Sequence, residues 1–372
     1  MGSKKILLIT HDISLSGAPK MLLLLWGHIR NIENFSIDVV SFTEEGKLRK
    51  RFENFADNFY TLPSFSKNIK WSLKKRFLRK FFKIEYTSEY DEFINLLKSN
   101  KYDCIFANTV LTIPFAKSIK SNNTSLVVNV HELSTVIDEF LPNINDYSNF
   151  IDLFIVPSML NKQVLTNKSI EESKISIIRD SSMLEFRGLE YNFDDKANFR
   201  VIGCGAAYWR KGDDLFLQLA SITSKIDSSI KFYWVGPQST EKRRVNNADI
   251  LKLGLTDNLF FVDEVEFNDL LSSMDVFALT SREDPFPLAA VEAGLYGLPI
   301  TCFSKSTGIS EVISANLVAD YMDVYNMSEI IISLSQNKQL YTDEALKNKE
   351  YFKNFLPDNI AKQIVTLLKK HL

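Results

Sequence analysis

Residues 276–303 read VFALTSREDPFPLAAVEAGLYGLPITCF. The two ends of this stretch, Val276–Leu279 and Ile300–Phe303, are short apolar runs typical of buried strands. Between them, Pro287 suits the first turn of a helix because its missing N–H is not needed there, and Gly297 suits the end of that helix. The stretch therefore predicts a strand, a loop, a helix and a second strand. Parallel α/β sheets are built from such units and bind ligands at the carboxyl ends of their strands.

Two acidic residues flank the predicted start of this helix. Asp284 lies in the loop and Glu292 lies about two turns into the helix, with seven residues between them. The unpaired N–H groups at such a helix start favour phosphate. The residues alone leave two interpretations open. Either the acids belong to a ligand site, or Asp284 complements the helix dipole and Glu292 is a solvated helix residue.

The length and composition fit a globular protein with two domains. The chain has 372 residues, of which 45% are hydrophobic and 24% charged, and this is enough for two separate cores. The longest apolar run near the start, Met21–Trp26, is far shorter than the ~18 residues of a membrane-spanning helix. A strand is predicted directly after the first residues, with no secretory signal before it. We therefore expect a cytoplasmic protein.

Short apolar runs alternate with helical patterns along the chain, as in the βα units of parallel sheets. In the first half, the predicted strands are Ile6–Thr10, Ile37–Phe42, Cys104–Ala107, Leu126–Val130, Leu153–Val156 and Ile175–Ile178. In the second half, they are Val201–Gly203, Phe232–Val235, Leu259–Val262, Val276–Leu279 and Ile300–Phe303. The polar stretch Ser181–Phe199 is predicted to link two domains, and Leu356–Leu372 is predicted to form a final helix.

Three other loops that follow predicted strands carry residues suited to ligand binding. Gly17 would let the backbone approach a ligand closely, although an ordinary turn explains it as well. His131 ends the strand Leu126–Val130, where a histidine can contact a sugar or handle a proton, or can be hydrogen-bonded within the fold. Arg210 and Lys211 lie near a helix start, whose dipole opposes their charge unless an anion lies between them.

The sequence contains no recognisable metal motif. Cys104, Cys204 and Cys302 each stand alone in an apolar run, which predicts reduced thiols rather than a disulfide or a metal site. No Asp-x-Asp triplet occurs in the sequence, so we expect no metal ion that holds a diphosphate. Basic side chains and a helix dipole can supply the same stabilisation.

The stretch from Asp284 to Pro299 resembles the acidic motif of the family-4 retaining glycosyltransferases, Glu-x7-Glu followed by Glu-Ala-x-x-x-Gly-x-Pro. Here it reads Asp284-x7-Glu292 and continues with Ala293, Gly297 and Pro299. A subset of the family has Asp-Pro-Phe-Pro at this point, as this chain does.

The resemblance implies the GT-B fold, an α/β architecture of two Rossmann-like domains that face each other across a cleft. The first domain, which binds the acceptor, would span 1–182 and be joined by the final helix, 356–372. The second domain, which binds the nucleotide sugar, would span 183–355.

The resemblance also implies roles for the candidate residues. The implied catalytic residues are His131, Asp284 and Lys211. The implied donor-binding residues are Gly17, Arg210, Lys211, Gly236, Phe286, Pro287, Leu288, Glu292 and Gly308. Glu292 would hold the ribose, and Asp284 with the loop after it would hold the donor sugar and its diphosphate. The lysine, with the arginine beside it, would offset the charge of the departing diphosphate, and the histidine would flank the reacting carbon.

One motif departs from the family pattern. The phosphate clamp of the family reads Arg-x5-Lys-Gly, and Lys211-Gly212 matches its second half. Its arginine position falls on Gly205 instead, which leaves Arg210 as the candidate substitute.

The implied function is that of a retaining glycosyltransferase that uses neither metal nor cofactor. It would move a sugar from a nucleotide-diphosphate sugar, with a UDP-sugar as the first expectation, to a glycan or lipid-linked acceptor. Such a reaction belongs to the synthesis of bacterial surface polysaccharides or glycoconjugates. Two alternatives stay open: a catalytically inactive GT-B partner or scaffold protein, which the missing arginine favours, and a GT-B sugar-nucleotide epimerase.

The segment 67–83 carries eight basic residues and no acidic one. On a helical wheel, its leucines and phenylalanines fill about half of the circumference and most of its cations fill the other half. This pattern predicts a helix on an anionic membrane surface, which would place the protein at the inner face of the plasma membrane. A surface helix that covers the domain core is the alternative. Nucleic acid is not an expected partner, because residues 1–180 carry a net charge of only +4, from 24 Lys/Arg against 20 Asp/Glu, and have no reader motif.

Overall fold

The computed structural model describes residues 3–63, 88–183, 198–263 and 267–372. The chain forms two compact units, of which the first is Met1–Arg179 with Pro357–Leu372 and the second is Asp180–Leu356. The sequence placed these boundaries after residues 182 and 355. The predicted membrane-surface helix, 67–83, lies outside the described residues, as does 184–197, which makes up most of the predicted linker.

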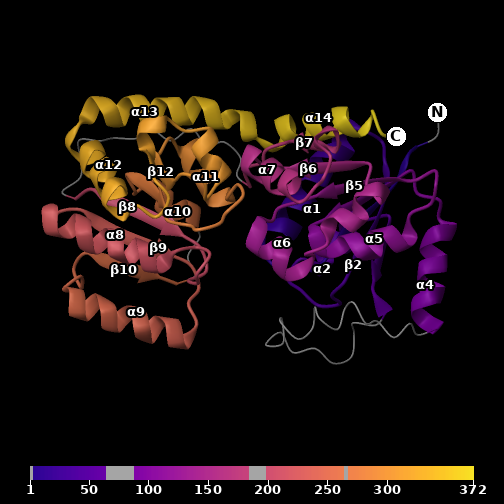
Figure 1. Cartoon of the computed structure of the whole chain (residues 1–372), viewed down its shortest axis with the longest axis horizontal. Coiled ribbons are helices and arrows are strands. Elements are labelled where there is room, and N and C mark those ends of the chain that lie inside the picture. The colour runs from indigo at the N-terminus through magenta and orange to yellow at the C-terminus, as the bar shows by residue number, and fades with distance from the viewer. Residues whose placement is uncertain (1–2, 64–87, 184–197, 264–266) are drawn as a thin grey trace. The chain divides into compact units, whose positions relative to one another are not determined.

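The first unit is built on a parallel sheet of seven strands in the order β3-β2-β1-β4-β5-β6-β7 (Figure 1). Its strands are β1 (Lys5–Thr10), β2 (Ser36–Ser41), β3 (Asn58–Thr61), β4 (Cys104–Asn108), β5 (Ser125–Asn129), β6 (Leu153–Val156) and β7 (Ile175–Ile177). Its helices are α1 (Gly17–Ile32), α2 (Arg49–Phe55), α4 (Ser88–Ser99), α5 (Ile113–Ile119), α6 (Ser134–Phe140), α7 (Met159–Asn167) and α14 (Pro357–Leu368). The edge strand β3 was not predicted, because its sequence NFYT is only partly buried and has no apolar run.

The final helix, α14, belongs to the first unit although 177 residues of the other unit precede it in the sequence. Its buried residues fall at one-turn intervals and form a single apolar stripe: Ile360, Ala361, Ile364, Val365 and Leu368. The stripe packs beside α1, and the Nδ1 atom of His28 on that helix lies 2.7 Å from an Asp358 oxygen. Lys4 donates a hydrogen bond of 2.9 Å to the carbonyl of Leu372. These contacts fix the end of the chain to the first unit.

The second unit has a parallel sheet of six strands in the order β10-β9-β8-β11-β12-β13. Its strands are β8 (Arg200–Cys204), β9 (Lys231–Val235), β10 (Leu259–Val262), β11 (Val276–Leu279), β12 (Ile300–Phe303) and β13 (Val318–Ala319). Its helices are α8 (Asp213–Ile226), α9 (Thr240–Leu253), α10 (Phe267–Leu271), α11 (Leu288–Tyr296), α12 (Val324–Gln336) and α13 (Lys338–Tyr351). The strand β13 escaped prediction because it has only two residues.

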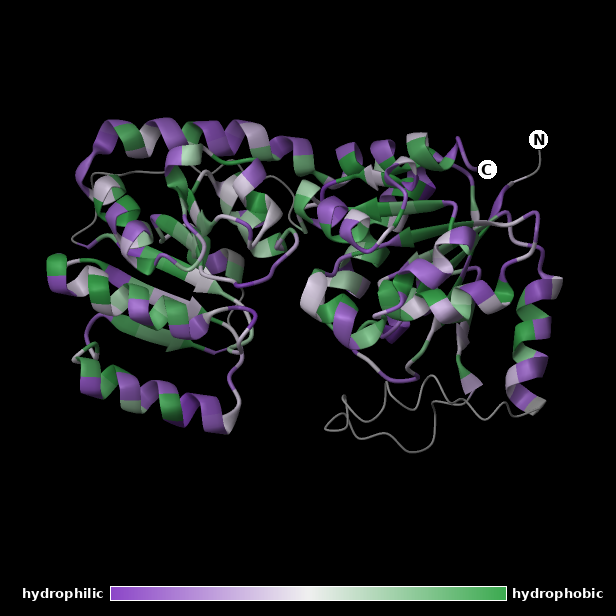
Figure 2. Cartoon of the chain, in the orientation of Figure 1, coloured by the Kyte–Doolittle hydropathy of each residue, from purple (hydrophilic) through white to green (hydrophobic). Residues whose placement is uncertain are grey.

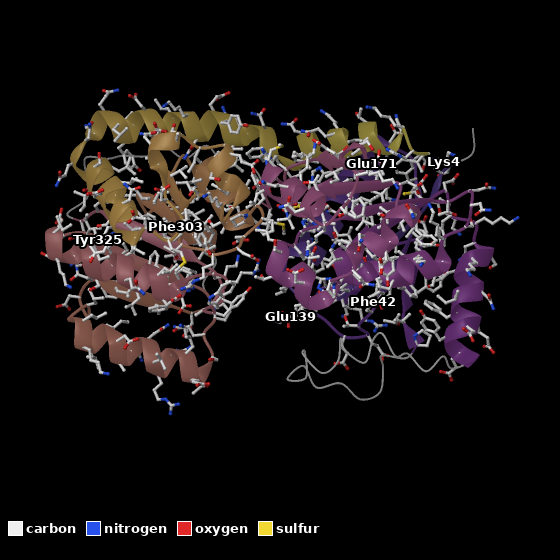
Figure 3. The ribbon with its side chains drawn as sticks, in the orientation of Figure 1. Lys4, Phe42, Glu139, Glu171, Phe303 and Tyr325 are labelled. Atoms are coloured by element: carbon white, nitrogen blue, oxygen red, sulfur yellow. The ribbon has the colours of Figure 1, made fainter. Side chains whose placement is uncertain are left out.

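Hydrophobic burial explains both units. The strands carry mostly hydrophobic residues, whereas helices such as α9 and α13 mix hydrophilic and hydrophobic residues along their length (Figure 2). In the second unit, Phe303 at the end of β12 is fully buried, while Tyr325 near the start of α12 is 71% exposed (Figure 3). Buried parallel strands of this kind need helices on both faces, which agrees with the alternation of strands and helices along the chain.

The predicted helix after β11 is α11, whose start differs by one position from the prediction and whose end at Gly297 agrees with it. Pro287 is the N-cap, with φ −65° and ψ 128°, so it lies just before the helix rather than in its first turn. The extended ψ angle lets the chain enter from the loop, and Leu288 becomes the first helical residue. Gly297 ends the helix in the left-handed conformation with φ 83°, as glycine does at many helix ends.

Each sheet has one point at which the strand order reverses. In the first unit it lies between β1 and β4, and in the second it lies between β8 and β11. Open α/β sheets bind ligands beside such a point, at the carboxyl ends of the two strands. The loops that follow these four strands are therefore the first places to look for a site. No helix in the described part of the chain is both long enough and apolar enough to cross a bilayer.

Candidate functional site

Two loops of the second unit meet where the strand order reverses. The loop after β8 runs from Gly205 to Gly212, and the loop after β11 runs from Thr280 to Pro287. The Thr280 hydroxyl donates a hydrogen bond of 2.9 Å to the carbonyl of Gly212. Gly212 has φ 70°, and a Cβ atom there would lie 2.0 Å from the Thr280 carbonyl oxygen. Only glycine therefore lets the two loops come this close.

The basic residues of the first loop converge on the acid of the second. Lys211 Nζ lies 2.5 Å from Asp284 Oδ2, and Arg210 Nη1 lies 3.9 Å from Asp284 Oδ1. The Arg210 side chain also donates to the carbonyl of Glu283 at 3.3 Å and to the Tyr208 hydroxyl at 3.0 Å. Asp284 is only 5% exposed. Two cations thus share one nearly buried carboxylate and keep charge to offer to an anion.

The clamp position that lacks arginine has a backbone conformation suited to glycine. Gly205 has φ 144°, a conformation that residues with a side chain rarely adopt. A Cβ atom there would lie 3.0 Å from the side-chain carbons of Lys211, so the lysine stem covers this position. The Gly205 carbonyl accepts a hydrogen bond of 2.9 Å from Trp234 Nε1. Arg210 is instead the arginine that this chain brings to Asp284.

The pKa of the Cys204 thiol is affected by the charged residues of the site. Burial raises the pKa of Cys204, at the end of β8, to about 12. Lys211 opposes the rise, whereas the carboxylates of Glu292 and Asp284 add to it. The three charged groups therefore act on one point of the structure, although they come from different segments. The thiol stays protonated at neutral pH and supplies no nucleophile.

The loop after β11 is held by backbone hydrogen bonds. Asp284 N donates to the carbonyl of Ser306 at 2.9 Å, and Gly308 N donates to the carbonyl of Pro285 at 2.8 Å. The predicted donor-binding residue Gly308 thus joins its own loop to the acidic loop. The ring of Phe286 is 2% exposed and packs edge-on against Phe355 at 5.4 Å. What Phe286 offers to a ligand is therefore its backbone, not its ring.

Two other predicted residues of the second unit take well-defined places. Glu292 lies on α11 and is 8% exposed, which is unusual for a glutamate and differs from a solvated helix residue. Gly236 follows β9 with φ 145°, and a Cβ atom there would lie 2.3 Å from the Gly205 carbonyl oxygen. The close approach of the two loops is sufficient reason for this glycine.

The first unit places polar residues at its own reversal point. His131 Nε2 lies 2.7 Å from Asn129 Nδ2 and 3.2 Å from Asn108 Oδ1, so the ends of β4 and β5 meet at this imidazole. Thr109, directly after β4, lies 3.3 Å from His11 Nδ1, which follows β1. Gly17 is the first residue of α1, the helix that follows β1 and the loop that contains His11.

The sequence did not predict these partners of His131, although one signal was available. Asn108 and Asn129 are polar residues at the ends of otherwise apolar strands, and both are buried. Thr109 has φ 86°, a conformation that costs a residue with a side chain about 1–3 kcal/mol. Such strain gathers at functional sites, so it agrees with a ligand site at this edge of the first sheet.

Cys104, Cys204 and Cys302 are all free thiols. Within the described residues, no group of three or more His, Cys, Asp or Glu side chains is arranged to hold a metal ion.

One known protein family matches part of this chain. Residues 191–353 match the family model described as glycosyl transferases group 1. The matched residues lie within the second unit, Asp180–Leu356. The match contains both loops of the candidate site.

Three curated proteins are similar to this chain over matches of different length. The chain is 22% identical over 301 residues to an uncharacterized 41.2 kDa protein in the cps region of Klebsiella pneumoniae, covering 75% of this chain and 82% of that one. It is 24% identical over 158 residues to an uncharacterized glycosyltransferase of Haemophilus influenzae, covering 41% and 44%. It is 26% identical over 153 residues to the mannosylfructose-phosphate synthase of Agrobacterium fabrum, covering 39% and 33%. The chain thus spans less than half of the latter two relatives.

Solved structures match the whole chain. HepE of Anabaena, in complex with UDP and glucose, has a TM-score of 0.76 at 17% identity and covers 98% of this chain and 99% of its own. The lipopolysaccharide outer core galactosyltransferase WaaB has a TM-score of 0.77 at 14% identity and covers 99% and 100%. At these identities the likeness establishes the fold alone. The two Rossmann-like parallel sheets and these neighbours give the GT-B fold, as the resemblance implied.

Proposed function

We propose that the chain is a retaining glycosyltransferase that moves a sugar from a nucleotide-diphosphate sugar to a glycan or lipid-linked acceptor. One observation carries the proposal: Arg210 and Lys211 converge on Asp284 at the reversal point of the second sheet. This point lies inside the residues that match the group 1 glycosyl transferase model. Basic side chains beside a helix start are suited to a diphosphate.

The chemistry of the leaving group explains these charges. When the bond between the sugar and the nucleoside diphosphate breaks, negative charge develops on the diphosphate, and fixed positive groups that stabilise it lower the barrier. Lys211 and Arg210 would supply this charge together with the N–H groups at the start of α11. The Lys211 ammonium now contacts Asp284 at 2.5 Å, and it would share its donors between this carboxylate and the phosphate. The sequence lacks the Asp-x-Asp triplet that would bring a metal ion, so we propose a metal-independent reaction.

The other residues would bind and orient the two substrates. Glu292 would accept hydrogen bonds from the ribose hydroxyls, for which its burial provides a fixed geometry. Asp284 and the loop after it would orient the donor sugar, and His131 would flank the reacting carbon. The acceptor hydroxyl would attack the sugar from the same face from which the leaving group departs. The leaving phosphate would take the proton of that hydroxyl. This route retains the anomeric configuration and needs no protein nucleophile.

The relatives favour particular substrates. The structures of HepE contain UDP, glucose or UDP-glucose, which supports a UDP-sugar as donor. The Klebsiella relative lies in a cps region, and WaaB is a lipopolysaccharide galactosyltransferase. These names support a role in bacterial surface polysaccharide or glycoconjugate synthesis. As part of the same proposal, the protein would act in the cytoplasm at the inner face of the membrane. The basic segment 67–83 would bind that surface.

The alternative is an inactive GT-B partner or scaffold protein. The glycine at the clamp position, Gly205, favours it, because the arginine of the family pattern is lost there. The Lys211, Arg210 and Asp284 cluster favours the enzyme, because a scaffold has no need to keep buried charges in this arrangement.

A panel of donors distinguishes these two functions. Purified protein is mixed with UDP-, GDP- and ADP-sugars, and the thermal midpoint and the release of nucleotide are measured. We expect one donor to raise the midpoint, because a ligand that binds only the folded state stabilises it. Glu292→Ala should abolish this shift. Glu329→Ala, which removes an exposed acid of α12 in the same unit, should leave it unchanged. No shift with any donor would contradict the transferase and favour the scaffold.

A further inference from the structure

Arg282 has a contact pattern that the proposed chemistry does not use. It lies in the loop after β11, two residues before Asp284, and is 8% exposed. Its Nη1 and Nη2 atoms donate hydrogen bonds of 2.8 and 2.7 Å to the two carboxylate oxygens of Asp214, in the first turn of α8. Two parallel hydrogen bonds fix the orientation of both groups, which a single point charge cannot do.

The same arginine also holds the chain before the two clamp cations. Arg282 Nη1 donates to the carbonyl of Trp209 at 2.7 Å, and its guanidinium lies 5.5 Å from the Trp209 ring centre. Its backbone N–H donates to the carbonyl of Arg210 at 2.8 Å. The Arg282 side chain therefore binds both ends of the segment 209–214, at Trp209 and at Asp214. Arg210 and Lys211 lie between these two contacts.

Stability alone gives a weak reason for this arrangement. The Arg282 side chain is nearly buried, which costs desolvation, whereas the Asp214 carboxylate that offsets its charge is 42% exposed and screened by water. A bidentate pair does provide a unique geometry for the loop it holds. Burial raises the pKa of Asp214, but the hydrogen bonds and charge of Arg282 outweigh this and lower it, so the pair is ionised at neutral pH.

We propose that Arg282 is a positioning residue that aims Arg210 and Lys211 at the diphosphate of the donor. The inference rests on the proposed function of this site. Its bonds run to the segment 209–214, whereas Glu292, the proposed ribose ligand, lies two turns into α11. Loss of Arg282 should therefore weaken the hold on the terminal phosphate and leave the hold on the nucleoside unchanged.

The experiment compares a nucleoside diphosphate with its monophosphate. The dissociation constants of UDP and UMP are measured by calorimetry for the full chain and for Arg282→Met, and a GDP/GMP or ADP/AMP pair replaces them if the donor panel selects another base. We expect UDP to bind about tenfold more weakly to the variant, since one misplaced charge-assisted contact is worth about that much. The dissociation constant of UMP for the variant should stay within about twofold of its value for the unaltered chain. The kcat of transfer should fall more than the KM for the donor rises.

Matched variants separate positioning from folding. Asp214→Asn should change the ratio of the UDP and UMP dissociation constants in the same direction. The double variant of Arg282→Met and Asp214→Asn should bind UDP no more weakly than Arg282→Met alone, because the two side chains act as one unit. Arg282→Lys keeps the positive charge but cannot form the two parallel hydrogen bonds of a guanidinium. It should therefore restore only part of the preference for UDP over UMP. Arg243→Met removes an ion pair with Asp263 at 2.5 Å in the same unit, where both side chains are exposed, and should change neither constant.

The possible failures can be told apart. If the unaltered chain binds no nucleoside diphosphate, the proposed function falls and the inference falls with it. If the chain prefers UDP to UMP and Arg282→Met keeps that preference, the inference is overturned while the function stands. If the variant weakens UDP and UMP equally, Arg282 serves the fold and not the clamp, and the inference is again overturned.

Discussion

Replacing Lys211 with methionine is expected to lower the kcat of sugar transfer about a hundredfold to a thousandfold, as loss of one preorganised charge at an active site does. Methionine keeps most of the aliphatic stem that covers Gly205, so the loop should keep its shape. The ammonium that offsets the developing charge is lost, and Asp284 is left with Arg210 at 3.9 Å as its cationic neighbour. Initial rates with the donor selected by the panel provide the measurement.

The control is a lysine with a similar ion pair away from the site. Lys347 Nζ lies 2.9 Å from Glu344 Oε1 and is 61% exposed. Lys347→Met should leave the rate unchanged. A rate for Lys211→Met within a factor of about three of the unaltered chain would contradict the assignment of Lys211 as the cation at the leaving group.

Replacing Gly212 with alanine is expected to lower the free energy of unfolding of the second unit by about 3 kcal/mol, from a left-handed backbone and a steric clash together. The alanine Cβ would lie 2.0 Å from the Thr280 carbonyl oxygen, so the two loops of the site would have to separate. The midpoint of thermal unfolding should fall by several degrees, and donor binding should weaken because the loops carry Lys211 and Asp284.

Gly254 supplies a control with nearly the same backbone. Its φ is 68° against 70° for Gly212, and a Cβ atom there would meet nothing within 4 Å. Gly254→Ala therefore isolates the backbone strain, which is about 1–2 kcal/mol for alanine in the left-handed region. Equal destabilisation by the two substitutions would show that the contact between the loops adds nothing to the stability of the unit.

The sequence predicted most of the fold because parallel strands buried on both faces are apolar along their length. Val276–Leu279 and Ile300–Phe303 were predicted with the bounds that the structure has. The strand β3 was missed because its residues are only partly buried, and β13 because two residues carry no pattern. Pro287 was placed one position too far into its helix, since proline suits both the N-cap and the first turn and the ψ angle is set by the loop.

The candidate site was predicted in its residue types but not in its contacts. Lys211 and Asp284 were each expected near a phosphate, yet nothing in the sequence shows that residues 73 positions apart form an ion pair. Arg282 had no motif to mark it, because its role depends on a partner at the start of another helix. The two loops meet because β8 and β11 are neighbours in the sheet although they are not neighbours in the sequence. The pattern of residues in one sequence does not show which strands are neighbours.

The proposed resemblance to a retaining family is tested most directly by the anomer that the protein releases. The α-linked nucleotide sugar selected by the panel is incubated with the protein, and the first product is followed by proton NMR, before the free sugar can equilibrate. We expect the α-anomer, or an α-linkage when an acceptor is present, and formation of either about a hundredfold to a thousandfold more slowly with Lys211→Met. The β-anomer as first product would contradict same-face attack, and the absence of turnover with a donor that binds would contradict the transferase itself.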